Sequence, residues 1–534
     1  MSNPGSLVLG VDASTQSVTV EARRSEDFTV VGSARIPLAR AVPPCSEQDP
    51  HSWWAALSQC LSRLRADGID TRAISAIAVG GQCHGLVALD SHEEVIRPAK
   101  LWNDTTGAPY IQQLVREYGS DYWANICGSV PTAAFTVAKL AYLAAHEPDT
   151  CHRLARILLP HDYLNFRLSG EFFSDRSEAS GTGYFDSRAN EYRREVIAQC
   201  LRAGLRINLE REDVRTCLPP DENHLASHNT EEIADQWAKQ IAERVTLPEI
   251  RSVENISVTV SDDAAAELGL SRGVRLAPGG GDQHLAAAGI GLTPGDLCFS
   301  LGTSGVVFTI SDTPIIDPSG MIDGVASVTG TWQPLVCTLN CTLITDHIAQ
   351  LFGVDVDELG QYALAADISA PRPVMAAYFG GERSPQYPNA RGLLAGISSD
   401  TGRAELACSA FEGVIFGLLR GVRNMNNHGI ATDGRVLAVG GGARSAAYHQ
   451  LLADHLQRTV ASVDVPEATA RGAALQAMAV LHGTSMTQMC RQYAPEEKTR
   501  THPRALPWPE AFSSYLHACE LSVAFCSEGA SHAG

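Results

Sequence analysis

The sequence predicts an α/β protein built from two similar halves. A unit of apolar strand, polar turn and second strand occurs twice, at residues 7–23 and again at residues 297–310. Between and after these units, strand patterns alternate with helix patterns, which is typical of layered α/β folds. The chain has 534 residues, more than one hydrophobic core normally supports, so we expect two domains.

The first half should open with a buried hairpin. An apolar run at residues 7–11 ends in a polar turn that starts at Asp12, and alternation resumes through Val18 and Val20. Later elements follow from the same patterns. Helices are predicted at residues 52–65, 137–146, 403–424 and 445–455, and strands at residues 73–79 and 436–439.

Domain limits follow from changes in composition. Residues 205–246 are charged and uneven and contain Pro219-Pro220, so we interpret them as a surface insertion and a candidate oligomer contact. We place the N-terminal domain at residues 1–276, the C-terminal domain at 277–490 and a tail at 491–534. The tail suggests no function, and a homodimer is one expected assembly.

The net charge of the chain restricts the classes of molecule that it can bind. The formal net charge is −19, and such a surface repels nucleic acids and anionic lipids. The charge does not exclude ATP as a ligand, because backbone N–H groups and a divalent cation can bind an anion within an acidic protein. Residues 1–10 lack the features of a signal peptide, and no window reaches the ~18 apolar residues of a membrane span. We therefore expect a cytoplasmic protein.

Cysteine usage favours buried thiols over a metal site. The chain has 14 cysteines and no CxxC pair, and the closest spacing, Cys337 to Cys341, has no histidine cluster nearby. Free thiols in a reducing compartment explain this pattern better than zinc does.

The two repeated turns could hold phosphate. Turns rich in Ser, Thr and Gly present hydroxyl and N–H groups, as at Thr15 and Thr303. Asp12 could hold Mg²⁺ through water, since Mg²⁺ prefers oxygen ligands. Each turn alone is more often an ordinary hairpin, and it is the repetition that favours phosphate binding.

Three glycines, Gly440 to Gly442, follow a predicted strand and precede a predicted helix. Glycine allows close approach, and a helix N-terminus offers N–H donors, so a nucleotide is a reasonable ligand. The spacing is not that of a GxGxxG dinucleotide motif, which counts against NAD. A purely structural turn remains the alternative.

Another glycine run ends in an acid at Asp282. A carboxylate in a crowded backbone could take the proton of a sugar hydroxyl during phosphoryl transfer. The alternative is that Asp282 is the N-cap of the alanine-rich helix that follows.

Polar groups suited to a polyol occur at Gln82, His84 and Asp104, and Trp102 could cover an apolar sugar face. A structural histidine and a buried tryptophan are the ordinary alternatives.

Taken in this order, the segments resemble the FGGY family of carbohydrate kinases from about residue 7 to residue 483. The family's C-terminal signature is complete at residues 392–397, 405–406 and 409–412. In the N-terminal signature Thr136, Lys139 and Leu140 fit, and Tyr142 stands where Trp is usual.

Within the family, the resemblance is to enzymes that phosphorylate xylulose. The matching stretches are residues 47–50, 53–54, 81–86, 101–104, 159–164, 174–175, 179–182 and 440–445. The resemblance implies an α/β fold with two actin-like ATPase (ribonuclease H-like) domains flanking a deep catalytic cleft, and transfer of phosphate from ATP to a ketopentose, D-xylulose.

The same resemblance assigns residues. It implies that Asp282 is the catalytic base and that Asp12 is the carboxylate of a Mg²⁺·ATP site. Sugar contacts are expected from Gln82, Cys83, His84, Trp102, Asp104 and Gln283, and nucleotide contacts from Thr15, Gln16, Gly302, Thr303, Gly441, Gly442 and Ala443.

Four further positions depart from the family pattern. Cys83 replaces Met and Gln283 replaces Asn on the sugar side, while Thr19 and His161 each stand where Lys is common. The alternatives are therefore another substrate such as ribulose or glycerol, a silent sugar or nucleotide sensor, and an actin-like or chaperone-like ATPase.

Overall fold

The computed structural model describes residues 5–211 and 230–531. The chain forms two compact units. The first consists of Met1–Leu292, Val325–Trp332 and Val465–Ala494, and the second consists of Thr293–Gly324, Gln333–Asp464 and Pro495–Gly534.

The first unit is built on a mixed sheet with the strand order β13-β5-β1-β2-β3, and β14 also pairs with β5. β1, β2 and β3 form an antiparallel meander, and β5 and β13 continue the sheet in parallel. The bounds are β1 Leu7–Ala13, β2 Ser17–Arg24, β3 Val30–Pro37, β5 Ile74–Gly81, β13 Arg275–Leu276 and β14 Gly280–Gly281.

Helices cover both faces of this sheet. Leu9 and Val11 of β1 share a core with α1 (Pro50–Ala66), whereas Val8 packs with α17 (Ala468–His482). Because successive strand residues point to opposite faces, α1 and α17 lie on opposite sides of the sheet.

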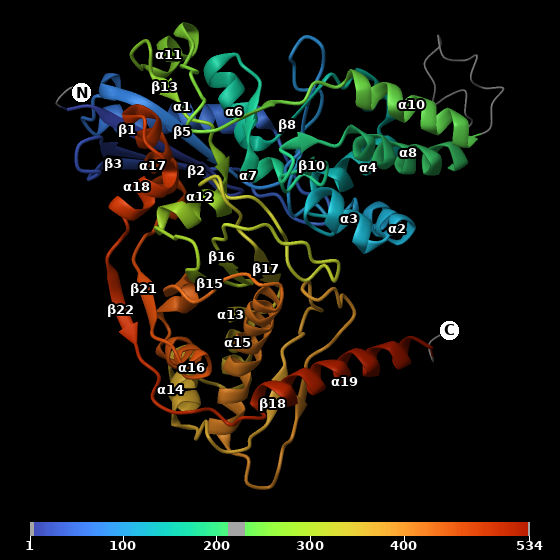
Figure 1. The fold of residues 1–534 in the computed structure, drawn as a ribbon, viewed down its shortest axis with the longest axis vertical. Helices are drawn as coiled ribbons and strands as arrows, with labels where there is room; N and C mark the ends of the chain where they lie inside the picture. Colours follow the sequence, from blue (N-terminus) through green and yellow to red (C-terminus); the bar gives the residue numbers. More distant parts are fainter. Residues whose placement is uncertain (1–4, 212–229, 532–534) are drawn as a thin grey trace. The chain divides into compact units, whose positions relative to one another are not determined.

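A second layer of helices completes the first unit. α4 packs with α8, and α8 packs with α10, side by side in Figure 1. The remaining elements are α2 Ala108–Tyr118, α3 Ser120–Cys127, α4 Thr136–His146, α5 Pro148–Arg153, α6 Pro160–Ser169, α7 Arg176–Ala179, α8 Arg194–Arg211, α10 Thr230–Arg244, α11 Asp262–Leu268, α12 Asp282–Gly289 and α18 Met486–Gln492, with the short strands β4 Glu47–Gln48, β6 Val87–Leu89, β7 Ala99–Lys100, β8 Arg156–Leu158, β9 Phe173–Asp175, β10 Phe185–Asp186, β11 Glu191–Tyr192 and β12 Glu249–Arg251.

The second unit has the sheet order β17-β16-β15-β20-β21-β22. Its core lies between this sheet and α13 to α16, with α15 as the longest of these helices. The bounds are β15 Leu297–Leu301, β16 Gly305–Thr309, β17 Leu335–Thr338, β18 Val374–Ala376, β19 Leu393–Ala395, β20 Val436–Val439, β21 Val460–Val463, β22 Glu497–Thr501, α13 Thr342–Phe352, α14 Val356–Ala365, α15 Arg403–Asn427, α16 Ala446–Leu456 and α19 Ala511–Ser531.

The predicted elements are confirmed with small shifts at their ends. The two hairpins are β1–β2 and β15–β16, and the predicted strand at residues 436–439 is β20. Both sheets continue the antiparallel meander with parallel strands, which agrees with the predicted duplication.

The predicted domain boundary at residue 276 differs from the observed division, since the first unit runs on to Leu292 and regains Val465–Ala494. The reason is close packing of α12 on α17. A Cβ atom on Gly289 would lie 2.0 Å from the Ala468 carbonyl oxygen, and one on Gly472 would lie 1.8 Å from that of Leu285. These glycines let the two backbones touch, so α17 belongs with the first unit.

The helical part of the predicted surface insertion at residues 205–246 is buried on one face. Trp237 and Ile241 of α10 are 1% and 2% exposed and belong to the core that α4 and α8 share. Residues 212–229 of this segment lie outside the described residues.

The predicted tail at 491–534 is also structured within its described part. β22 pairs with β21, and Phe512 and Tyr515 of α19 join the core of the second unit. No helix in the described ranges is long and apolar enough to cross a membrane.

Candidate active site

Asp12 lies near the end of β1, where it pairs with Thr19 of β2 and Gly80 of β5. Its Oδ1 atom is buried and has no hydrogen-bond partner among the described residues. Burial raises the pKa of Asp12 well above its usual value, and the charges of Asp282 and Glu467 raise it further. A cation beside this carboxylate would therefore be strongly favoured.

The turn after β1 is held from two sides. Thr15 Oγ1 donates to Gln82 Oε1 at 3.1 Å and accepts from Trp102 Nε1 at 3.0 Å. Gln48 Nε2 donates to the Thr15 carbonyl at 2.7 Å. Gln82 is only 1% exposed, so its amide fixes the turn, whereas the Trp102 ring is 41% exposed and can contact a ligand.

Asp282 is the first residue of α12, and Gly281 occupies the N-cap position. The N-cap alternative for Asp282 is therefore wrong. Its Oδ1 atom accepts hydrogen bonds from Cys83 Sγ at 3.1 Å and from the Gln283 amide at 2.8 Å. Burial raises the pKa of Asp282, and these two hydrogen bonds oppose the rise. A raised carboxylate pKa moves it toward the range in which a general base works best.

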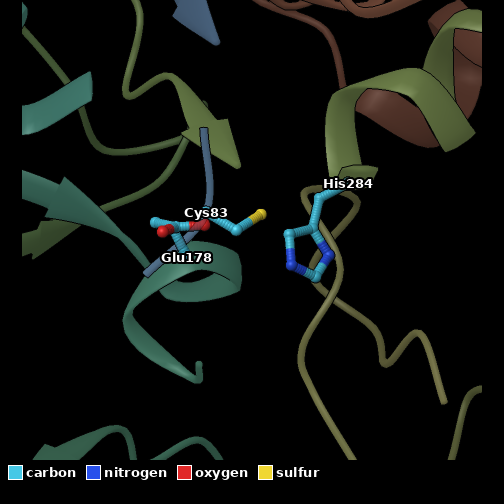
Figure 2. A group of neighbouring side chains, drawn as sticks. All are labelled: Cys83, Glu178 and His284. Carbon is cyan, nitrogen blue, oxygen red and sulfur yellow. The ribbon is translucent and has the colours of Figure 1, made fainter. Parts of the chain in front are cut away.

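A second carboxylate, that of Glu178, and the imidazole of His284 lie close to the Cys83 thiol. One ligand atom each of Cys83, Glu178 and His284 lies within 4.8 Å of the other two. Figure 2 shows the thiol of Cys83 directed toward the His284 ring, with Glu178 on its other side. Glu178 is fully buried, and burial raises its pKa well above the usual value.

His84 is held in a left-handed backbone conformation, with φ of 62°. Its amide donates to Glu178, its carbonyl accepts from Thr136 Oγ1 at 3.1 Å, and its ring stacks on Phe135 at 5.4 Å between centroids. Such a conformation is strained for a non-glycine residue and is kept only where neighbours fix it. These contacts fix both the backbone and the ring of His84.

Lys139 of α4 holds the loop that precedes this helix. It is 1% exposed, and its Nζ donates to three backbone carbonyls, those of Ala133, Ala134 and Phe135. Burial lowers the pKa of Lys139 to about 7. Lys139 thus fixes the loop whose Phe135 ring supports His84.

Asp104, predicted as a sugar contact, is 1% exposed and accepts hydrogen bonds from the Ser46 amide at 2.9 Å and Lys100 Nζ at 3.0 Å. Its Oδ1 atom accepts from the Thr106 amide at 3.0 Å. Both oxygens are engaged within the protein, so we leave Asp104 out of the proposed sugar contacts. Gln283, by contrast, is exposed beside Asp282.

The predicted nucleotide turns of the second unit lie together. A Cβ atom on Gly442 would be 2.9 Å from Leu301 Cβ, so the turn after β20 touches the end of β15. The Gly302 carbonyl accepts from the Thr342 amide at 3.0 Å, and Thr303 and Gly441 are exposed. Ala443 falls in the short 3₁₀ helix Gly441–Arg444.

Sequence reasoning missed Glu178, His284 and Glu467. Glu178 lies between two stretches that match the family, and His284 follows the Asp282-Gln283 pair, so their surroundings offered a weak signal. Glu467 precedes α17 and reaches the Asp12 region only through folding.

Two family models match the chain. The N-terminal domain of the FGGY family of carbohydrate kinases matches residues 7–202, and the C-terminal domain of that family matches residues 297–481.

Curated relatives and solved structures agree with the family models. The chain is 35% identical to a xylulose kinase of Streptomyces coelicolor over 490 residues, which is 92% of this chain and 91% of the relative. A xylulose kinase of Haemophilus influenzae is 29% identical over 96% of this chain and its own full length. The crystal structure of a Bifidobacterium adolescentis xylulose kinase superposes with a TM-score of 0.83 at 32% identity, covering 96% of this chain and 99% of that one.

A Plasmodium falciparum glycerol kinase, 16% identical with a TM-score of 0.73 over 98% of each chain, supports the fold alone. The predicted actin-like α/β fold is thus confirmed. The chain belongs to the FGGY family of carbohydrate kinases and is an ATP-dependent sugar kinase.

Proposed function

We propose that this kinase transfers the γ-phosphoryl group of ATP to D-xylulose, giving D-xylulose 5-phosphate, with Asp282 as the general base. The observation that carries the proposal is the setting of Asp282. Its carboxylate has a raised pKa and is oriented by Cys83, and it lies beside the family's sugar-binding pair Cys83 and His84. The two relatives above that carry the name xylulose kinase over nearly the whole chain support the sugar.

The chemical step is a displacement at phosphorus. Asp282 accepts the proton of the primary hydroxyl as that oxygen bonds to the γ-phosphorus. The bond from the γ-phosphorus to the bridging oxygen breaks, and ADP leaves. Most of the rate comes from positioning and charge neutralisation, and the base contributes about 10²–10⁴-fold.

The proposed phosphate contacts of the first unit lie in the turn after β1. Thr15 and Gln16 offer the turn after β1, and Trp102 holds the Thr15 hydroxyl while its exposed ring can cover the sugar. In the second unit, Gly302, Thr303, Gly441, Gly442 and Ala443 are the proposed nucleotide contacts.

Mg²⁺ fits the residues present. The buried Oδ1 atom of Asp12 lacks a hydrogen-bond partner among the described residues, and Asp282 and Glu467 add negative charge there. Oxygen donors and uncompensated charge are what Mg²⁺ requires. Asp12 would hold the ion through water, and when bound the ion neutralises charge on the transferring phosphate.

A substrate panel tests the sugar. Sugar-dependent ADP release should be strongest with D-xylulose among D-xylulose, L-xylulose, D- and L-ribulose and glycerol. If turnover is confined to another sugar, that sugar is the substrate in place of D-xylulose. The altered specificity would then be assigned to Cys83 and Gln283. No sugar-dependent turnover would favour a silent sensor.

Asp282→Asn tests the base. The amide keeps the shape of the side chain but cannot accept the proton, so kcat should fall at least about 10²-fold. ATP binding, measured by calorimetry, should stay close to that of the wild type. Gln283→Asn is the matched neighbour and should retain turnover. Normal kcat in Asp282→Asn would exclude the assignment.

A further inference from the structure

Cys83, Glu178 and His284 form a group of metal-ligating side chains, and of the three only Cys83 has a role in the proposed kinase mechanism. They come from the end of β5, from α7 and from α12, and one donor atom of each lies within 4.8 Å of the others. Figure 2 shows Cys83 between Glu178 and the His284 ring. Their donors are a thiol sulfur, a carboxylate oxygen and an imidazole nitrogen.

These donors suit Zn²⁺. In a tetrahedral zinc site with bonds of about 2.0–2.3 Å, ligand atoms lie roughly 3.3–3.6 Å apart, so only small side-chain shifts are needed. Asp282 Oδ1 lies 3.1 Å from Cys83 Sγ but is not a member of the group, so a water molecule would be the fourth ligand. Mg²⁺ does not suit the group, because it prefers oxygen ligands and octahedral geometry.

The charge of the group also calls for a cation. Glu178 is 0% exposed, and its Oε2 atom accepts no hydrogen bond within the described residues. Across the described ranges, neither Glu178 nor Asp282 forms an ion pair with a lysine or an arginine. Buried carboxylates are normally paired or bound to a metal.

Neighbouring residues hold the three donors in place, and Cys83 is the member of the group that is partly exposed. Glu178 Oε1 accepts from the His84 amide, which fixes the carboxylate. A Cβ atom on Gly281 would lie 2.2 Å from Glu178 Oε2 and 2.7 Å from Cys83 Sγ, so only glycine lets the group close. Cys83 remains partly exposed and gives an ion access.

We propose that Cys83, Glu178 and His284 form a Zn²⁺ site and that its occupation switches the kinase off. As the zinc–sulfur bond forms, the Cys83 thiol releases its proton to solvent. The zinc-bound sulfur can then no longer donate a hydrogen bond to Asp282 Oδ1, so the proposed base loses the group that orients it. The inhibitory part rests on the proposed role of Asp282, whereas the metal site itself does not.

Direct binding is the first test. The metal-free enzyme should bind one Zn²⁺ per chain in calorimetry. Co²⁺, used as a spectroscopic probe, should give a thiolate-to-metal charge-transfer band in the near ultraviolet. Cys83→Ser should abolish that band and weaken Zn²⁺ binding at least about 100-fold, and Glu178→Gln should weaken it about 10–100-fold.

Cys45→Ser is the matched control. Cys45 is an exposed cysteine in a second group with Glu47 and Asp104. There the Lys100 ammonium lies 3.0 Å from Asp104 and already supplies positive charge. This variant should bind Zn²⁺ and Co²⁺ as the wild type does. Unchanged binding in both Cys83→Ser and Glu178→Gln would overturn the site, as would loss of the band in Cys45→Ser.

Inhibition is the second test. At a buffered free Zn²⁺ concentration and excess Mg²⁺, sugar-dependent ADP release by the wild type should fall at least tenfold and return when a chelator is added. The Zn²⁺ concentration that halves activity should rise at least tenfold in Glu178→Gln. Binding without inhibition would overturn the switch and keep the site. If no sugar is turned over, the Co²⁺ band still decides whether the site exists.

Discussion

The two units share one sheet plan and differ in how they handle charge. The orders β3-β2-β1-β5-β13 and β17-β16-β15-β20-β21 have the same sequence of antiparallel and parallel neighbours. Asp12 pairs with Thr19 and Gly80, and Ser300 pairs with Val306 and Val439 in the corresponding place. The frame is duplicated, but the carboxylate occurs in only one copy.

Buried acids show the same contrast. In the first unit, burial raises the pKa of Asp12 and of Asp162. In the second unit, Glu412 pairs with Arg372 at 2.9 Å and with His455 at 2.6 Å, and although burial opposes it, these partners lower the pKa of Glu412. At these positions the first unit leaves Asp12 without an ion-pair partner in the described residues, whereas the second unit pairs Glu412 with Arg372 and His455.

The largest expected effect is in the second unit. Glu412→Gln leaves buried Arg372 without its carboxylate, so the free energy of unfolding should fall by about 3–5 kcal/mol. Urea denaturation measures this, and hydrogen exchange in α15 locates it. Glu405→Gln on the same helix can still cap it and should cost less than about 1 kcal/mol. Equal losses in both variants would remove the contrast.

Asp12→Asn tests the buried acid of the first unit that has no ion-pair partner in the described residues. Loss of the charge that would hold Mg²⁺ should reduce kcat about 10²–10³-fold, because metal stabilisation of the transition state amounts to several kcal/mol. Ser300→Ala, at the corresponding place in the second unit, should change kcat less than about threefold. Steady-state ADP release measures both. A comparable loss in Ser300→Ala would mean that both hairpins contribute alike.

Asp175 gives a pH test of an acid shifted by burial. Burial raises the pKa of Asp175 to about 6 from the usual 3.8. Between these values the folded protein holds a proton that the unfolded chain releases, so this contribution to stability is lost as pH rises. Asp175→Asn lacks this loss and should gain, relative to the wild type, on the order of 3 kcal/mol between about pH 4 and pH 6.

Urea denaturation followed by tryptophan fluorescence can measure the Asp175 effect. Six of the seven tryptophans lie in the first unit, namely Trp53, Trp54, Trp102, Trp123, Trp237 and Trp332. Asp27→Asn is the control of opposite sign, because the Thr29 amide and hydroxyl lower the pKa of Asp27. Parallel pH curves for the wild type and Asp175→Asn would contradict the prediction.

The smallest effect concerns the turns. The first turn has side-chain support from Trp102, whereas the second is held by backbone bonds such as Gly302 N–H to the Ser304 carbonyl at 3.2 Å. Trp102→Phe removes one hydrogen bond, worth about 0.5–1.5 kcal/mol, and should lower kcat/KM about 2–10-fold. In a double-mutant cycle with Thr15→Val, the combined loss should be smaller than the sum of the two single losses, because both variants remove this bond. Full additivity would show that the bond does not matter.

Local patterns predicted much of the fold. The hairpins at residues 7–23 and 297–310 and the strand at 436–439 are in place, because alternation and polar turns act over few residues. The boundary at 276 was misplaced, since the packing of α17 on α12 joins segments far apart in the chain. The same limit applies to α10, whose buried face depends on α4 and α8.

For the site, glycine runs and single acids pointed to Asp12 and Asp282, and the resemblance gave them roles that remain proposals. Cysteine spacing argued against zinc, and Glu178 and His284 drew no attention, because their meeting with Cys83 has no signature in local sequence. The sequence by itself determined the family, the paired hairpins and the residues that carry charge. Only the tertiary structure decided which charges are compensated, since burial and ion pairing depend on contacts between distant segments.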